Sequence, residues 1–362
     1  MPYEVQRETL MTRFLLPLLL FGWVSACAAA SSGPASTPAS DPASAPLDRR
    51  RPRPAVSGFG FSVSDLEASR TFFQTQLGAV ELGRAAAQGP ELDALVGIDG
   101  LSARAVHLRV GEEVVTLTAW KGEGPARRPG PDAQSNDADF QHLALVVSDI
   151  DRAHEKVLAG GAVPISLSGP ERIPESNLAA AGIRAFYFRD RDRHPLELIW
   201  FPAGKGAPRW QASSPLVLGV DHSAFSAAST DESLAFYVDG LGFEVAGRSF
   251  NTGIEQERLS GVADARVRIT GLRGESGPGL ELLVYEAPGP GQPRPSADTP
   301  IDLFYWETTV VVEDLEAVLA VVRGQGRRVR SRRIASCQLC WGGGRAALVE
   351  DPDGHVMRLV SR

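Results

Sequence analysis

Residues 186–200 read FYFRDRDRHPLELIW, a pattern that predicts two strands joined by a charged turn. The first strand ends at Arg189, and the second carries a single carboxylate, Glu197, within the apolar run PLELI. A buried carboxylate is costly unless a hydrogen-bond donor or a cation pairs with it. A related stretch, ALVEDPDGHVMRLVSR, covers residues 347–362, and there Arg358 stands in the position of the glutamate. What Glu197 faces is therefore the main structural question that the sequence raises.

The composition is that of a globular protein large enough for two domains. The chain has 362 residues, of which 43% are hydrophobic and 22% are charged. Its formal net charge of −7 argues against a nucleic-acid partner. The one basic cluster, RRVRSRR at residues 327–333, is interpreted as a solvated strand and turn rather than a phosphate-binding patch.

The N-terminal part predicts export. Residues 11–26 read MTRFLLPLLLFGWVSA, so residues 1–26 are expected to be a secretory signal, too short for a spanning helix. The sequence VSAC that ends at Cys27 resembles the lipobox of bacterial lipoproteins. The resemblance implies a lipid on Cys27 that anchors the protein to a membrane of the bacterial cell envelope, on the periplasmic side of the outer membrane in a Gram-negative cell. The alternative is an ordinary cleaved signal with an incidental cysteine.

The segment after the signal is expected to lack a fold. Residues 27–55 are rich in Ala, Ser, Pro and Arg and contain few large apolar side chains. Such a composition predicts a disordered tether.

Two further cysteines, Cys337 and Cys340, form a CQLC motif. In an exported protein this spacing favours a local disulfide. Half of a zinc site is a weaker interpretation, because no second Cys/His pair has the matching spacing, and no βαβ context supports a thioredoxin-like role.

The rest of the chain repeats one unit four times. Each copy has a strand, a turn that ends in Asp or Glu, a helix, and three more strands. Ser64-x-x-Glu67 and Ser148-x-x-Asp151 look like capping boxes at the helix starts of the first two copies. The four copies begin at residues 58, 142, 222 and 307.

These repeats carry a family resemblance. The helix starts VSDLE and VSDID, the helix motif SRTFFQTQLG and the turn DRDRHPLEL resemble the vicinal oxygen chelate superfamily. That superfamily includes glyoxalase I, extradiol dioxygenases, fosfomycin-resistance enzymes and bleomycin-binding proteins. The resemblance implies an α+β fold with four βαβββ units in two glyoxalase-like domains of cupped sheets. We expect the first domain at residues 56–205 and the second at residues 214–362.

The resemblance also implies a set of metal ligands. In this superfamily each unit can offer one ligand from its first strand and a Glu from its fourth strand, and two paired units share one divalent ion. The first copy has poor ligands and the middle copies have good ones, whereas in the fourth copy the arginine cannot bind. The positions in chain order are Gly58 and Thr116, His142 and Glu197, His222 and Glu281, and Glu307 and Arg358.

We therefore predict a metal site made by His142, Glu197, His222 and Glu281, with Glu307 as a candidate additional ligand. Such a set suits Zn, Ni, Mn, Fe or Co. A lone His on an apolar strand is often a core residue, and a lone Glu often pairs with Arg. Finding the same pair in two copies favours the metal.

Two pairings of the units are open. If sequential units pair, the candidate ligands are divided between two cups. If units two and three pair, one complete site forms, and units one and four make a cup without a metal. The distribution of the ligands slightly favours the second arrangement.

A metal in such a cup implies a small-molecule substrate that binds through neighbouring oxygens. The resemblance points to a glyoxalase-like lyase or isomerase with Glu197 and Glu281 as candidate catalytic bases. One alternative is a metal-free protein of the bleomycin-resistance kind that binds or sequesters a small molecule. Another is an extradiol ring-cleaving dioxygenase, whose ligand pattern Glu307 and Arg358 do not match.

Overall fold

A computed structural model describes residues 52–295 and 297–362. The predicted signal at residues 1–26, the lipidation of Cys27 and most of the predicted tether lie outside the described residues. Among the described residues, no helix has the length and apolar character needed to cross a membrane.

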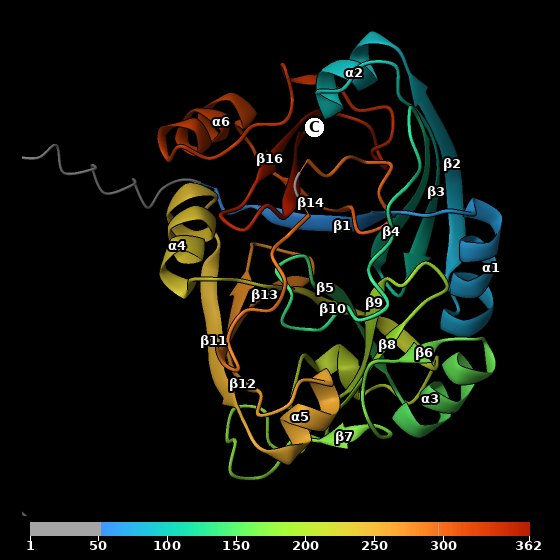
Figure 1. Ribbon diagram of the computed structural model, residues 1–362, viewed down its shortest axis with the longest axis vertical. Helices are drawn as coiled ribbons and strands as arrows, with labels where there is room; N and C mark the ends of the chain where they lie inside the picture. The colour runs from blue at the N-terminus through green and yellow to red at the C-terminus, as the bar shows by residue number, and fades with distance from the viewer. Residues whose placement is uncertain (1–51, 296) are drawn as a thin grey trace, which may run out of the picture. The chain divides into compact units, whose positions relative to one another are not determined.

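Units one and four share an eight-stranded sheet (Figure 1). The central contact is antiparallel, between the first strands of the two units, β1 and β14. The strand order is β15-β16-β17-β14-β1-β4-β3-β2. The strands are β1 (Ala55–Ser62), β2 (Val80–Gln88), β3 (Ser102–Val110), β4 (Glu113–Lys121), β14 (Trp306–Val311), β15 (Ala335–Ser336), β16 (Arg345–Glu350) and β17 (Val356–Ser361).

Units two and three share a nine-stranded sheet in the same way, through antiparallel β5 and β10. The strand order is β11-β12-β13-β10-β5-β9-β8-β6, and β7 pairs with β8. The strands are β5 (Gln141–Val147), β6 (Val163–Pro164), β7 (Glu171–Arg172), β8 (Arg184–Arg189), β9 (Pro195–Trp200), β10 (Val217–Ser226), β11 (Glu244–Asn251), β12 (Arg266–Arg273) and β13 (Gly279–Ala287).

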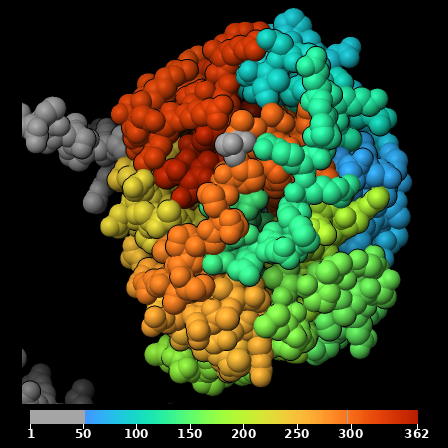
Figure 2. Space-filling view, viewed as in Figure 1, coloured from blue at the N-terminus to red at the C-terminus, as the bar shows by residue number. Residues whose placement is uncertain are grey.

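The predicted α+β class with curled sheets is confirmed, and the second of the two pairings is the one observed. Each sheet takes one unit from residues 56–205 and one from residues 214–362. The two segments that connect the sheets, one between β4 and β5 and the other between β13 and β14, lie side by side. Leu303 N donates to Arg127 O over 2.8 Å, and Gly291 N donates to Asn136 O over 2.7 Å. In the space-filling view these segments cross the middle of the visible face (Figure 2).

The helices of units one and two begin one residue later than the predicted capping boxes. Asp65 and Asp149 are the N-caps, and their side chains accept from backbone N–H groups three residues on. The predicted cap Ser64 instead bonds Asp192, with its N 2.8 Å and its Oγ 2.5 Å from the carboxylate. The helices are α1 (Leu66–Leu77), α3 (Ile150–Ala159), α4 (Thr230–Leu234) with a π-helical continuation (Ala235–Gly240), and α6 (Leu315–Gly324).

Two short helices and a 3₁₀ turn were not predicted. The α-helices α2 (Pro90–Val96) and α5 (Ile254–Ser260) lie between the second and third strands of units one and three. Each is seven residues long, too short to show a clear helical period in the sequence. The 3₁₀ turn η1 (Pro208–Gln211) lies in the joint between the halves of the chain.

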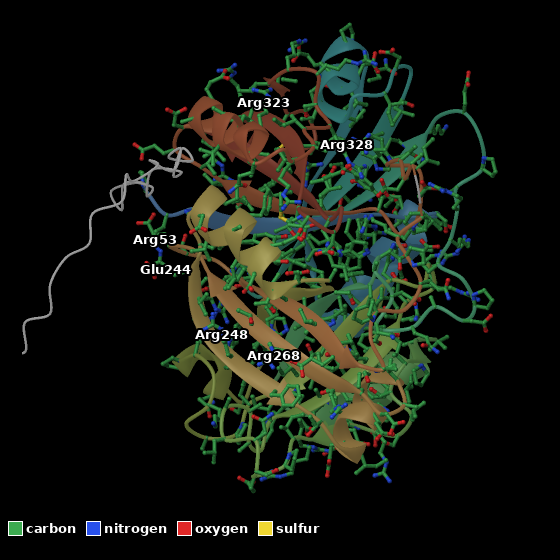
Figure 3. All side chains as sticks on the ribbon, turned by 60° about the vertical axis from the view of Figure 1, so that its left-hand side comes forward. Arg53, Glu244, Arg248, Arg268, Arg323 and Arg328 are labelled. Carbon is green, nitrogen blue, oxygen red and sulfur yellow. A yellow bond between two sulfur atoms is a disulfide. The ribbon has the colours of Figure 1, made fainter. Side chains whose placement is uncertain are left out.

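The basic cluster at residues 327–333 is neutralised within the protein. The side chain of Arg330 is only 6% exposed and pairs with Asp298 and Glu350. Figure 3 labels Arg328, which lies 3.0 Å from Glu350 beyond the end of α6. The other pairs of the cluster are Arg327 with Glu232, Arg332 with Asp99, and Arg333 with Glu91.

Candidate metal centre

The register of β5 and β10 brings two histidines together. His142 lies opposite Ala224, and His222 lies opposite Ala144, on adjacent antiparallel strands. Alternate residues of a strand share a face, so both imidazoles stand on the same side of the sheet. The alanines opposite them are small, which leaves room for the rings above the middle of the sheet.

The flanking strands bring in the two glutamates. Glu197 on β9 lies beside Ala144 of β5, and Glu281 on β13 lies beside Ala224 of β10. Each glutamate is thus next to a residue two places after a histidine, on the same face of the sheet. The predicted ligand positions of units two and three therefore converge on one region.

Three of the four predicted ligands form a tight cluster. His142 Nε2 is 3.1 Å and His222 Nε2 is 3.4 Å from Glu197 Oε2. One ligand atom from each residue lies within 4.8 Å of the others. Two atoms held about 2.1 Å from one ion are about 3.0 Å apart at a right angle and about 3.4 Å apart at the tetrahedral angle. The distances from the two histidines to Glu197 therefore suit a shared ion.

Glu281 lies at the edge of this cluster. Its Oε2 is 3.5 Å from His222 Nε2, but it is not a member of the group of three. Its side chain is 30% exposed, whereas those of the other three are at most 5% exposed. Glu281 thus reaches the solvent side of the centre.

The cluster leaves buried polar atoms unsatisfied. Both ring nitrogens of His142 and Oε2 of Glu197 are buried and have no hydrogen-bond partner. Although His142 Nε2 and Glu197 Oε2 are close, they are not aligned as donor and acceptor. A buried polar atom without a partner costs about 1–3 kcal/mol. A divalent cation between these atoms would remove that cost for two of them, so the residues present fit a metal.

The two glutamates have opposite electrostatic environments. Burial disfavours the charged form of Glu197, but His142 and His222 outweigh it and lower its pKa to about 2. Burial raises the pKa of Glu281, and the nearby carboxylates Glu197 and Asp221 raise it further. Burial opposes the charged form of His222, yet Glu281, Asp221 and Glu197 hold its pKa well above the ordinary value.

Aromatic rings enclose His142. The ring of Tyr187 on β8 is centred 4.7 Å from that of His142, and the ring of Phe140 is 5.6 Å away. Both side chains belong to an apolar cluster that also includes Leu283 and residues after α5. The centre is therefore lined by apolar and aromatic side chains on this side.

One residue next to the centre was missed. Asp221 Oδ2 lies 3.0 Å from His222 Nδ1. Strict alternation places Asp221 on the opposite face from His222, but the pairing of β10 with β5 shifts between Val220 and His222. This irregularity brings the carboxylate to its neighbour's ring. The adjacent Asp-His pair was the available signal in the sequence.

In the other sheet the first strands pair in the same register, but an ion pair stands where the candidate metal ligands stand in units two and three. Glu307 lies opposite Gly60, and Gly58 lies opposite Thr309. Glu307 forms a buried ion pair with Arg358, and Tyr305 Oη donates to Glu307 over 2.8 Å. The candidate additional ligand Glu307 is therefore in a different sheet from the cluster of three.

The glycine of this second site has no room for a ligand. A Cβ atom at Gly58 would meet Val114 O at 2.7 Å, closer than real Cβ contacts. A histidine there would require the backbone of β4 to move.

The CQLC cysteines and the histidine of the charged turn have structural contacts. Cys337 and Cys340 are joined by a disulfide, and Cys337 is buried in an apolar cluster with Leu339. His194 fastens its turn, since Nδ1 lies 2.8 Å from Asp190 and Nε2 lies 2.9 Å from Ser62 O.

Comparisons with known proteins agree with this architecture. The sequence model of the Glyoxalase/Bleomycin resistance protein/Dioxygenase superfamily matches residues 56–198 and 219–359. A 2-epi-5-epi-valiolone epimerase from Actinomyces sp is 34% identical over 155 residues, which are 41% of this chain and 81% of that protein.

Solved structures share the fold. Glyoxalase I from Zea mays has a TM-score of 0.54 at 15% identity, and the match covers 85% of this chain and 92% of that one. A putative dioxygenase from Bacillus subtilis subsp. subtilis str. 168 has a TM-score of 0.50 at 12% identity, with 86% of each chain covered. With its family match repeated over both halves, the chain belongs to the Glyoxalase/Bleomycin resistance protein/Dioxygenase superfamily.

Proposed function

We propose that the protein is a divalent-metal-dependent isomerase or lyase that moves a proton on a small molecule bound through neighbouring oxygens. The observation that carries the proposal is the convergence of His142, Glu197 and His222 beside the more exposed Glu281, with buried atoms of His142 and Glu197 left without hydrogen-bond partners. The similarity to an epimerase supports an isomerase among the reactions of the superfamily. The predicted identity of the ion remains Zn, Ni, Mn, Fe or Co.

His142, Glu197 and His222 would hold the ion. When bound, the metal supplies a positive charge that stabilises an oxygen next to the carbon that loses its proton. The low pKa of Glu197 keeps this carboxylate ionised at neutral pH, and its burial keeps it from solvent and substrate. Glu197 is thus better suited to be a ligand than a base.

Glu281 is better suited to be the base. Its side chain reaches the solvent side of the centre, where a substrate would enter. Its raised pKa makes the carboxylate a stronger proton acceptor, and it would give a proton back to the product. Of the two candidate bases, we therefore assign the proton transfer to Glu281.

The test has two separate readouts. The full-length chain, loaded in turn with each of the five metals, is analysed for bound metal by mass spectrometry. We expect about one equivalent in the wild type, loss in Glu197→Gln and His222→Ala, and retention in Glu281→Gln. Wild-type protein that binds none of the five metals would contradict the proposal and favour the metal-free binding alternative.

The second readout follows the proton. The probe is 2-epi-5-epi-valiolone in D₂O, with deuterium uptake followed by NMR. We expect exchange in the metal-loaded wild type and a loss of at least about 100-fold in Glu281→Gln, in the range that general base catalysis contributes. Equal exchange rates in the two proteins would remove Glu281 from this role.

A further inference from the structure

A buried carboxylate stands behind the centre without being a candidate ligand. Asp221 is only 8% exposed, and its Oδ2 lies 3.0 Å from His222 Nδ1. The indole Nε1 of Trp210 donates to Asp221 Oδ1 over 3.0 Å. Arg273 Nη2 lies 3.0 and 3.1 Å from the two carboxylate oxygens, and its Nη1 donates to Asp221 O over 2.9 Å. The neighbouring His222 and two groups from other elements, Trp210 and Arg273, thus fix one carboxylate.

We propose that Asp221, held by Trp210 and Arg273, is a positioning residue that fixes His222 with its Nε2 toward the candidate metal. This inference rests on the proposed function. An imidazole that donates Nδ1–H to a carboxylate presents an unprotonated Nε2, the form that binds a cation. The same hydrogen bond sets the plane of the ring, so Nε2 points at Glu197, 3.4 Å away.

The two histidines of the centre differ in this respect. His142 Nδ1 is buried without a hydrogen-bond partner, and its ring packs against the rings of Tyr187, Phe140 and His222. His222 is held by the charged carboxylate of Asp221. The orientation of one ligand thus depends on Asp221, and that of the other depends on aromatic packing.

The support for Asp221 extends to the other sheet. Arg209 stacks on the ring of Trp210 at 3.9 Å and lies 2.7 Å from Glu113, at the start of β4. Glu113 also accepts from Val220 N over 2.9 Å. The segment between β9 and β10 is therefore held in place at Trp210, whose indole donates to Asp221.

A glycine makes this close packing feasible. Gly219 has a φ of 154°, and a Cβ atom there would meet Glu113 Oε2 at 2.5 Å and the Trp210 ring at 3.2 Å. Any larger residue would push Glu113 or Trp210 away from β10. The glycine thus leaves room for both side chains next to the backbone two residues before Asp221.

The experiment compares metal affinity in Asp221→Asn, Trp210→Phe and wild type. Full-length protein is titrated with Zn²⁺ against a competing chelator, and Co²⁺ spectra report the coordination. We expect Asp221→Asn to bind Zn²⁺ about 10–100-fold more weakly, with an altered Co²⁺ spectrum, as for other residues that orient metal-bound histidines. Trp210→Phe keeps an aromatic ring but loses the N–H. It should change the Zn²⁺ affinity and the Co²⁺ spectrum in the same direction, by a smaller amount.

Asp302→Asn is the matched control, because Asp302 is also a buried carboxylate that pairs with an arginine, Arg127. It should lose stability with an unchanged affinity for Zn²⁺. If Asp221→Asn does not fold, Trp210→Phe decides the question alone. Wild-type affinity in the folded Asp221 and Trp210 variants would overturn this inference and leave the proposed function standing, whereas a wild type that binds no metal would overturn both.

Discussion

The buried ion pair Glu307–Arg358 lies in the sheet of units one and four, where its contribution to stability can be tested. In Arg358→Met the carboxylate of Glu307 remains, with its side chain 5% exposed and Tyr305 as its hydrogen-bond donor. Removing one partner of a buried ion pair typically costs about 3–5 kcal/mol, because the other charge stays buried without compensation. The bond from Tyr305 stabilises the carboxylate, so we expect the lower end, about 3 kcal/mol of the free energy of unfolding.

Urea unfolding at neutral pH measures this loss. The double variant Glu307→Gln/Arg358→Met carries no buried charge at this site, so it should regain most of the stability. Arg328→Met is the control, because Arg328 is 65% exposed in its pair with Glu350 and should cost at most about 1 kcal/mol. The interpretation is wrong if Arg358→Met costs less than about 1 kcal/mol, or if the double variant is no more stable than the single one.

Three further results are expected. Zn²⁺ at about 100 times its Kd should raise the free energy of unfolding by about 2.7 kcal/mol in the wild type and not in Glu197→Gln, as thermal melts can show. Burial, and next the charge of Arg358, lower the pKa of His107 from 6.5 to about 4, so the native state binds fewer protons than the unfolded state between these values. Stability should therefore fall as the pH drops through that window, and less steeply in His107→Gln, by urea melts at each pH. Replacing Cys337 and Cys340 by Ser should cost about 2 kcal/mol because the closed loop is short, and reductant should destabilise the wild type alone.

The repeat made the fold predictable from the sequence. Four copies with one order of elements define both the α+β class and the strand positions at which ligands recur. Because the two glutamates occupy the same register in units two and three, their convergence with the histidines follows once those units share a sheet. The distribution of good ligands indicated that pairing, since only the middle copies kept both.

Other features depend on details that a pattern does not contain. Ser64 fits a capping box, but a carboxylate from the other sheet, Asp192, binds it, and Asp65 caps the helix instead. Asp221 was missed because a local irregularity in β10 breaks the alternation on which face assignments depend. The difference between Glu197 and Glu281 is one of exposure, which equal positions in two repeats cannot reveal.

The two sheets neutralise their buried carboxylates in different ways. Units two and three bring charged side chains together in one sheet, and two strands of unit four do so in the other, on a buried face where a lone charge is costly. Arg358 meets this need for Glu307 from within the chain. Glu197 and Glu281 have histidines as their ion-pair partners, and these are cationic only when they carry a proton. A proton on His222 and a divalent ion beside its Nε2 are therefore competing ways to neutralise the same carboxylates. For that reason metal affinity should fall as the pH falls, whereas the arginine of the other cup needs neither proton nor metal.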